Sequence, residues 1–160
     1  MGGVSPPMGC ERSIAGVRIH PLRVIEDARG AVLHMLRADA LDFGVFGEIY
    51  FSEVNPGAVK AWKRHQRMTQ RFAVPIGRIR LAIYDDRDGS PTAGLVQVIE
   101  FGRPDAYSLV VVPPLLWYGF ETIGDQAALM ANCADLPHDP MESEHLDPAA
   151  AAGRIPYVWT

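Results

Sequence analysis

Apolar residues recur mostly at every second position along the chain, in short runs separated by Gly, Pro and Asp. Such alternation puts apolar side chains on one face of a strand and polar side chains on the other, so it predicts β-structure. The runs predict strands at residues 17–25, 31–35, 46–54, 58–64, 70–75, 78–84, 95–101, 107–112, 117–122 and 127–133. Many short strands at near-regular spacing indicate a sandwich or a closed barrel.

The segments between these runs have the composition of turns. Residues 27–30, 55–57 and 85–91 are rich in Asp, Asn, Gly and Pro, which adopt the backbone angles that turns require. Residues 37–41 form the only helical turn predicted before the core. Residues 134–160, rich in Pro, Asp and Ala, are predicted to lie across the barrel as a strap. We expect a single domain at residues 14–160, preceded by a flexible tail at residues 1–13.

Size and charge narrow the class of function. A chain of 160 residues fits one domain, and its net charge of −4 provides no basic surface for nucleic acid or an anionic membrane. Cys10 and Cys133 are too few and too far apart for a disulfide framework, which favours a reducing compartment. The chain has neither an apolar run of about 18 residues nor the apolar core of a signal peptide. We therefore expect a cytoplasmic protein that binds a small molecule.

The stretch at residues 57–77, GAVKAWKRHQRMTQRFAVPIG, follows the spacing of the first cupin motif. The matching positions are Gly57, Lys63, His65, Gln70 and Gly77. This similarity implies an all-β cupin barrel, a double-stranded β-helix or jelly roll, with His65 facing its interior. Cupin metal sites use neutral imidazoles and a carboxylate. Lys63, Gln70 and Tyr118 stand at those ligand positions here, so we expect no bound metal.

Further segments match one known family in their order and approximate spacing. They are DARG at 27–30, HQ at 65–66, GRIRLAIYDDR at 77–87, SPT at 90–92, VPPLLWYGF at 112–120, DPME at 139–142, DP at 147–148 and IPYVW at 155–159. On these segments the chain resembles the dTDP-4-dehydrorhamnose 3,5-epimerase family over residues 17–159. The resemblance implies an epimerase or isomerase without metal or cofactor, acting on a nucleotide-linked 4-keto-6-deoxy sugar. It also implies a homodimer whose N-terminal strands cross to the partner.

Family enzymes remove a proton next to the keto group. This chemistry needs a base of near-neutral pKa, an acid on the opposite ring face and a group that stabilises the enolate oxygen. His65 matches the family's base, and imidazole suits the task because its pKa is about 6.5. The family's acid, a Tyr, falls on Ala131, and its enolate-stabilising Lys falls on Gln70. Tyr118 as acid and Lys63 as electrophile are the expected replacements, against the alternatives of an aromatic lining residue and a solvated lysine.

The substrate-binding residues follow from the same comparison. Arg29 matches the family's Arg after the DARG turn, and with Arg64 or Arg71 it is expected to hold a phosphate through bidentate hydrogen bonds. Arg71 reaches the family's Lys position only by a one-residue shift, which turns it to the opposite strand face. Trp62 and Trp117 are expected to line the pocket, and Gln70 is expected to donate its amide to the substrate.

The carboxylate that orients the family's His lies beyond the terminal Trp motif. The present chain ends at Thr160, so Asp139 or Asp147 is expected to replace it.

Two other functions fit the loss of the family's Tyr and Lys. One is a cupin-fold cyclase or dehydratase of a small keto compound in secondary metabolism. The other is a non-catalytic homologue that binds a sugar. Weak nucleotide binding would favour the first, and nucleotide-sugar binding without proton exchange would favour the second.

Overall fold

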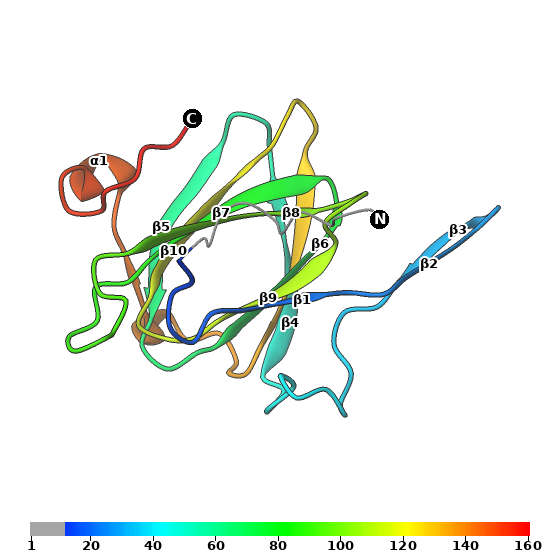
Figure 1. The fold of residues 1–160 in the computed structure, drawn as a ribbon, viewed down its shortest axis with the longest axis horizontal. Coiled ribbons are helices and arrows are strands. Elements are labelled where there is room, and N and C mark those ends of the chain that lie inside the picture. Colours follow the sequence, from blue (N-terminus) through cyan, green and yellow to red (C-terminus); the bar gives the residue numbers. More distant parts are fainter. Residues whose placement is uncertain (1–11) are drawn as a thin grey trace, which may run out of the picture.

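Two five-stranded sheets, antiparallel throughout, face each other in the computed structural model, which describes residues 12–160 (Figure 1). The first sheet has the order β1-β9-β6-β11-β4, the second has the order β12-β5-β10-β7-β8, and β2 and β3 form a separate hairpin. The elements are β1 (Arg18–Pro21), β2 (Val24–Asp27), β3 (Gly30–Leu33), β4 (Glu48–Val54), β5 (Val59–His65), β6 (Gln70–Ile76), β7 (Arg78–Tyr84), β8 (Val96–Gly102), β9 (Ser108–Val112), β10 (Trp117–Thr122), β11 (Ala128–Ala134), the 3-10 turn η1 (Pro140–Glu142), β12 (Ser143–His145) and α1 (Pro148–Ala151). The all-β prediction is confirmed.

No helix among residues 12–160 is long and apolar enough to cross a membrane.

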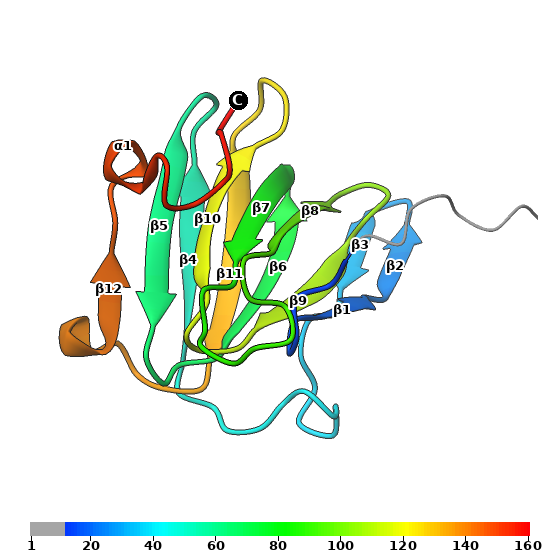
Figure 2. The ribbon, with the colours of Figure 1, turned by 60° about the vertical axis from the view of Figure 1, so that its left-hand side comes forward.

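Most predicted strands agree with the structure to within two residues, and those at 78–84 and 117–122 have the predicted bounds. The strand predicted at residues 17–25 is wrong, because the chain forms β1 and β2 there. β1 pairs with β9 in the first sheet, whereas β2 turns away and pairs with β3 in a hairpin that projects from the barrel (Figure 2). Alternation of apolar residues shows that a segment is extended but does not show which partner it takes.

Two predictions at the N-terminal side have different outcomes. The helical turn predicted at residues 37–41 is wrong, since two hydrogen-bonded turns, from Ala40 N to Arg37 O and from Phe43 N to Ala40 O, occupy this segment. Helix nucleation is costly, and so short a segment does not overcome it. The predicted tail, residues 1–13, falls almost wholly outside the described residues, and the domain boundary stays a prediction.

The C-terminal residues cross the outer face of the second sheet, as the predicted strap does, but they contain structure that the composition did not indicate. β12 extends the second sheet by pairing with β5, and Ser143 lies opposite His65. Tyr157 and Trp159 pack their rings against Trp62, with ring centroids 6.0 and 5.1 Å away. The pairing of β12 with β5 brings the turn η1 beside the end of β5.

Apolar side chains fill the space between the sheets. Phe72 and Val74 on β6, and Leu81 and Ile83 on β7, are at most 1% exposed. A second apolar cluster covers the outer face of the second sheet beneath the strap and includes Trp62, Ala82, Trp117, Ala151 and Ile155. Because successive strand residues point to opposite faces, neighbouring positions on β5 and β10 divide between the interior and this outer cluster.

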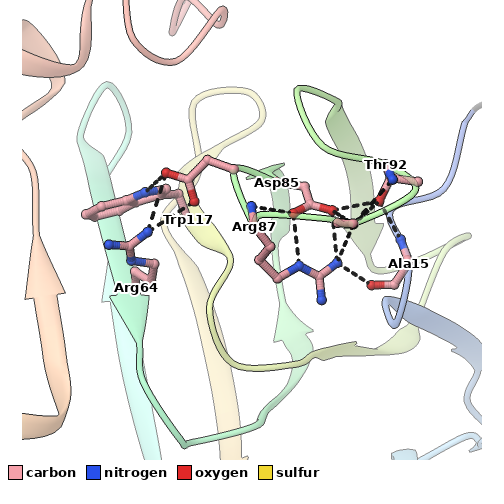
Figure 3. A network of polar contacts seen from close by, with 8 residues as sticks. Ala15, Arg64, Asp85, Arg87, Thr92 and Trp117 are labelled. Carbon is pink, nitrogen blue, oxygen red and sulfur yellow. Dashed lines mark hydrogen bonds and ion pairs between the residues drawn. The ribbon is translucent and has the colours of Figure 1, made fainter.

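A polar network beyond the end of β7 is formed by the YDDR and SPT segments (Figure 3). The buried carboxylate of Asp85 accepts hydrogen bonds from Arg87 Nε at 2.9 Å, Ser90 Oγ at 2.7 Å and Thr92 Oγ1 at 2.6 Å. Arg87 and Thr92 also bind the backbone of Ala15, which ties down the segment before β1. Burial raises the pKa of Asp85, but these hydrogen bonds outweigh it and hold the pKa well below its ordinary value. These family-like segments therefore stabilise the barrel.

Replacing Asp85 with alanine is expected to lower the free energy of unfolding by roughly 3 kcal/mol, because it leaves the partners of a buried charge unsatisfied. A carboxyl group with a depressed pKa stabilises the fold fully above its unfolded pKa, about 3.9, and loses this effect as the pH falls. The difference from wild type should therefore shrink below about pH 4. Urea unfolding measures it, with the exposed Asp88→Ala as control. A loss below about 1 kcal/mol at neutral pH would contradict the role given to Asp85.

Candidate active site

A cavity of about 350 Å3 lies between the two sheets. Tyr50, Phe72 and Met130 line it from the first sheet, and Lys63, Tyr118 and Phe120 line it from the second. Its size lies within the range of small-molecule sites, and its walls combine aromatic and aliphatic side chains with hydroxyl and cationic groups. The arrangement suits a small ligand with a few polar groups.

A buried chain of three side chains leads from the strap to this cavity. The Nδ1 atom of His65 lies 2.6 Å from Oε2 of Glu142, and its Nε2 atom lies 3.0 Å from the Tyr118 hydroxyl. The other carboxylate oxygen of Glu142 accepts hydrogen bonds from the backbone N–H of Arg67 at 2.6 Å and of Met68 at 2.8 Å. Glu142 is thus fixed by the turn that follows β5, and in turn it fixes the imidazole ring.

These contacts determine the protonation of His65. A carboxylate only accepts hydrogen bonds, so Nδ1 of His65 carries the proton and Nε2 is left to accept one from Tyr118. Burial lowers the pKa of His65, the charge of Lys63 lowers it further, and the hydrogen bond with Glu142 opposes them only in part. Burial raises the pKa of Glu142, but its hydrogen bonds from His65, Arg67 and Met68 outweigh this and leave the pKa below its ordinary value. At neutral pH the pair is therefore a neutral imidazole beside a carboxylate.

Tyr118 lies between His65 and the cavity. His65 is 4% exposed and does not line the cavity, whereas Tyr118 does. Burial raises the pKa of Tyr118 well above its ordinary value, so the phenol keeps its proton at neutral pH. A proton from a bound molecule can thus reach Nε2 of His65 through the Tyr118 hydroxyl.

Two further side chains with nitrogen donors, Lys63 and Gln70, were predicted to contact the substrate. Lys63, on the same face of β5 as His65, lines the cavity, and within residues 12–160 it forms no ion pair. Burial lowers the pKa of Lys63, although the charge of Glu142 opposes the shift. Gln70 is 1% exposed, and its Nε2 has no hydrogen-bond partner in the described part of the chain. Lys63 is therefore placed to stabilise a developing enolate oxygen, whereas the buried Gln70 does not line the cavity.

Arg71 and Trp117 are not brought to the cavity, because each lies one position away from an inward-facing residue. The Arg71 side chain donates from Nε to the backbone oxygen of Asp42. Trp117 belongs to the outer cluster, where the Arg64 guanidinium lies 4.5 Å from its ring centroid. Neither side chain lines this cavity.

Trp62 lies at the border of the cavity, whereas Arg29 lies outside it. Trp62 borders the cavity, but its ring packs on the strap side against Trp159. Arg29 lies in the turn of the β2–β3 hairpin, where its guanidinium binds Asp27. This hairpin projects away from the two packed sheets (Figure 2). Within one chain, Arg29 and the cavity are not part of one site.

The prediction that Asp139 or Asp147 orients His65 is wrong. Asp139 accepts a hydrogen bond from Met141 N at 2.9 Å and Asp147 accepts one from Ala149 N at 2.8 Å, so both cap short turns. Glu142 holds His65 instead. The DPME segment contains this residue, but only the pairing of β12 with β5 shows which acid faces the imidazole.

Sequence reasoning also missed Tyr50 and Asn132. Tyr50 is at an inward position of β4, and Asn132 is its partner on β11. The side chain of Ala131, where the family's Tyr was aligned, points away from the cavity, because its neighbours Met130 and Asn132 point inward. The alternation along residues 46–54 indicates that Tyr50 points inward. The sequence does not show that Asn132 lies beside it, because that depends on the pairing of β4 with β11.

Comparison with known proteins agrees with this geometry. No family model matches the chain, but it is 35% identical over 122 residues to the probable low-salt glycan biosynthesis epimerase Agl13 of Haloferax volcanii, covering 75% of this chain and 78% of that protein. It is similar to the crystal structure of a dTDP sugar isomerase from Desulfovibrio desulfuricans G20, with 51% identity, 91% and 92% coverage of the two chains and a TM-score of 0.88. ChmJ, a 3'-monoepimerase from Streptomyces bikiniensis, shares the fold at 18% identity, with coverage of 92% and 76% and a TM-score of 0.79.

The jelly roll and its buried acid–base chain, together with these relatives, define a cupin-fold enzyme of the epimerase and isomerase class. The chain belongs to the cupin-fold dTDP-sugar epimerase and isomerase family. The resemblance inferred from the sequence is thereby confirmed.

Proposed function

We propose that this protein is an epimerase or isomerase of a nucleotide-linked 4-keto-6-deoxy sugar that works without metal or cofactor and uses His65 as its base. The observation that carries the proposal is the buried chain Glu142–His65–Tyr118, which ends at the cavity. The names of the relatives support the substrate class, since one is a dTDP sugar isomerase and another a probable glycan biosynthesis epimerase.

The proton path follows from the contacts. The keto group acidifies the neighbouring C–H bond, and its proton passes to the Tyr118 oxygen as the Tyr118 hydroxyl proton passes to Nε2 of His65. The electrons of the broken C–H bond form the enolate. The carboxylate of Glu142 balances the charge of the imidazolium, and the ammonium of Lys63, which lines the cavity, stabilises the enolate oxygen.

Incubation with a dTDP-linked and a UDP-linked 4-keto-6-deoxy sugar tests the proposal. We expect nuclear magnetic resonance to show conversion of at least one of them to an isomeric sugar, and much slower conversion of the same sugar without its nucleotide. Conversion of small keto compounds alone would instead support the cyclase or dehydratase. Nucleotide-sugar binding without any conversion would support the non-catalytic homologue.

The pH dependence of kcat/KM should reflect the shifted groups. The base must be neutral, so kcat/KM should rise with pH through an acid limb whose midpoint lies below 6.5, because burial lowers the pKa of His65. It should fall again below pH 10.5 as Lys63 loses its proton, because burial lowers that pKa also. In Lys63→Met the acid limb should move to higher pH and the alkaline limb should disappear. Unchanged limbs in this variant would contradict the roles given to both residues.

The predicted role of Arg29 in phosphate binding requires a second copy of the chain. The projecting hairpin carries the partly exposed apolar residues Ile25, 42% exposed, and Val32, 58% exposed. We propose a homodimer in which this hairpin reaches the partner's cavity. Light scattering should then give twice the mass of the chain, and Arg29→Ala should raise KM with little change in kcat. A monomer with full activity would contradict both expectations.

A further inference from the structure

Tyr50 presents a second phenol to the cavity, on the wall opposite Tyr118. It lies on β4 of the first sheet, whereas His65 and Tyr118 lie on β5 and β10 of the second. The side chains along β4 alternate between half-buried and exposed, and Tyr50 shares the inward face with Ser52. A ring bound between the sheets would thus have Tyr118 against one face and Tyr50 against the other.

Hydrogen bonds fix the direction in which the Tyr50 hydroxyl can donate. The backbone N–H of Arg71 donates to Oδ1 of Asn132 at 3.0 Å, which orients the amide. Nδ2 of Asn132 therefore donates to the Tyr50 oxygen at 2.8 Å and to Oε1 of Gln70. Because Tyr50 accepts from Asn132, its own proton is not needed for that contact. Within residues 12–160, Asn132 is the only hydrogen-bond partner of this hydroxyl, so the proton can be donated to a molecule in the cavity.

Protonation and access agree with the task of an acid. Burial raises the pKa of Tyr50 above its ordinary value of 10.0, and the hydrogen bond from Asn132 opposes the shift only in part, so the phenol is protonated at neutral pH. Among the residues that line the cavity from the first sheet, only Tyr50 and Ser52 carry a hydroxyl. A phenol releases its proton far more readily than the aliphatic alcohol of Ser52 does.

We propose that Tyr50 is the general acid that protonates the sugar carbon on the face opposite the one from which the proton was removed. The proposal rests on the proposed function, and it predicts that the enzyme inverts the configuration of the sugar carbon. In this step the Tyr50 O–H bond breaks, the new C–H bond forms from the enolate electrons, and the enolate oxygen becomes a ketone again. The Tyr50 phenolate is stabilised by Nδ2 of Asn132 and regains a proton from solvent, since the side chain is only half-buried. The His65 imidazolium gives up its proton to solvent in the cavity through the Tyr118 hydroxyl, which restores the neutral base.

Tyr50→Phe tests the role, because it removes the acid and leaves the base in place. In deuterium oxide, with a nucleotide-linked 4-keto-6-deoxy sugar that wild type converts, the variant should form the inverted product about 100-fold more slowly. The recovered substrate should still take up deuterium at a rate within a few-fold of wild type. Tyr107→Phe is the matched control, since Tyr107 is 7% exposed but lies outside the cavity.

Two outcomes would overturn the proposal, and both differ from failure of the proposed function. Formation of inverted product at the wild-type rate would show that Tyr50 is not the acid. Loss of deuterium uptake together with product, while the nucleotide sugar still binds, would show that Tyr50 acts in proton removal instead. Wild type that neither converts nor exchanges any nucleotide sugar would contradict the proposed function itself.

Asn132→Asp provides a second variant of almost unchanged shape. The carboxylate still accepts from the Arg71 N–H but cannot donate to Tyr50, so the Tyr50 hydroxyl would turn and donate its proton to it. Formation of the inverted product should therefore fall nearly as far as in Tyr50→Phe. Inversion at the wild-type rate in Asn132→Asp would contradict the donor geometry on which the proposal depends.

Discussion

His65→Gln is expected to reduce turnover of the nucleotide-linked keto-sugar by about 1000-fold, within the range that a positioned general base contributes. The amide of glutamine can still donate to Glu142, so the buried carboxylate keeps a partner. It cannot take up a proton near neutral pH, so the path that begins at Tyr118 has no acceptor. Initial rates at saturating substrate give kcat directly.

Two observations separate this effect from damage to the fold. The variant should bind the nucleotide with nearly wild-type affinity and keep its thermal unfolding midpoint within a few degrees. The control His138→Gln changes an exposed histidine of the strap and should leave kcat unchanged. Turnover in His65→Gln within about 10-fold of wild type would show that His65 is not the base.

Glu142→Gln is expected to lower kcat by about 10,000-fold, the loss found when the carboxylate that orients a serine protease histidine becomes an amide. The reason is specific to this site. One Glu142 oxygen accepts two backbone N–H groups, from Arg67 and Met68, so the glutamine must keep its oxygen there. Its NH2 group then faces Nδ1 of His65 and forces the proton onto Nε2. The imidazole is still present, but the nitrogen that should accept a proton already carries one.

Glu144→Gln is the matched control for this change. Glu144 is two residues further along the strap, is exposed and pairs with Arg64 at 2.7 Å, so its loss should cost little stability and no turnover. A proton nuclear magnetic resonance spectrum of the histidine ring should show the altered tautomer in Glu142→Gln. Wild-type turnover in that variant would contradict the assigned proton path.

The sequence predicted the barrel because each strand carries its own pattern. Alternation marks extended segments one at a time, and the spacing from Gly57 to Gly77 identifies the cupin motif without knowledge of strand pairing. The same spacing located His65, which lies on a strand that the alternation bounds to within one residue.

The rest of the site depends on pairings that a single sequence does not contain. Glu142 reaches His65 because β12 joins β5, and Asn132 reaches Tyr50 because β11 pairs with β4. A shift of one residue on β6 separates the interior Gln70 from the outward Arg71. Arg29 leaves the barrel on the β2–β3 hairpin, so its predicted role depends on the proposed second copy of the chain. Each of these positions depends on strand register and on contacts between segments that are far apart in the sequence.

The most direct test of the central claim, that His65 takes a proton from a nucleotide-linked keto-sugar, is mass spectrometry of the sugar nucleotide after incubation in deuterium oxide. With wild type, the recovered sugar nucleotide should gain deuterium next to the keto group at least as fast as it is converted. With His65→Gln, the uptake should fall to the rate seen without enzyme. Equal deuterium uptake by the variant and wild type, or conversion by wild type without any uptake, would contradict the account.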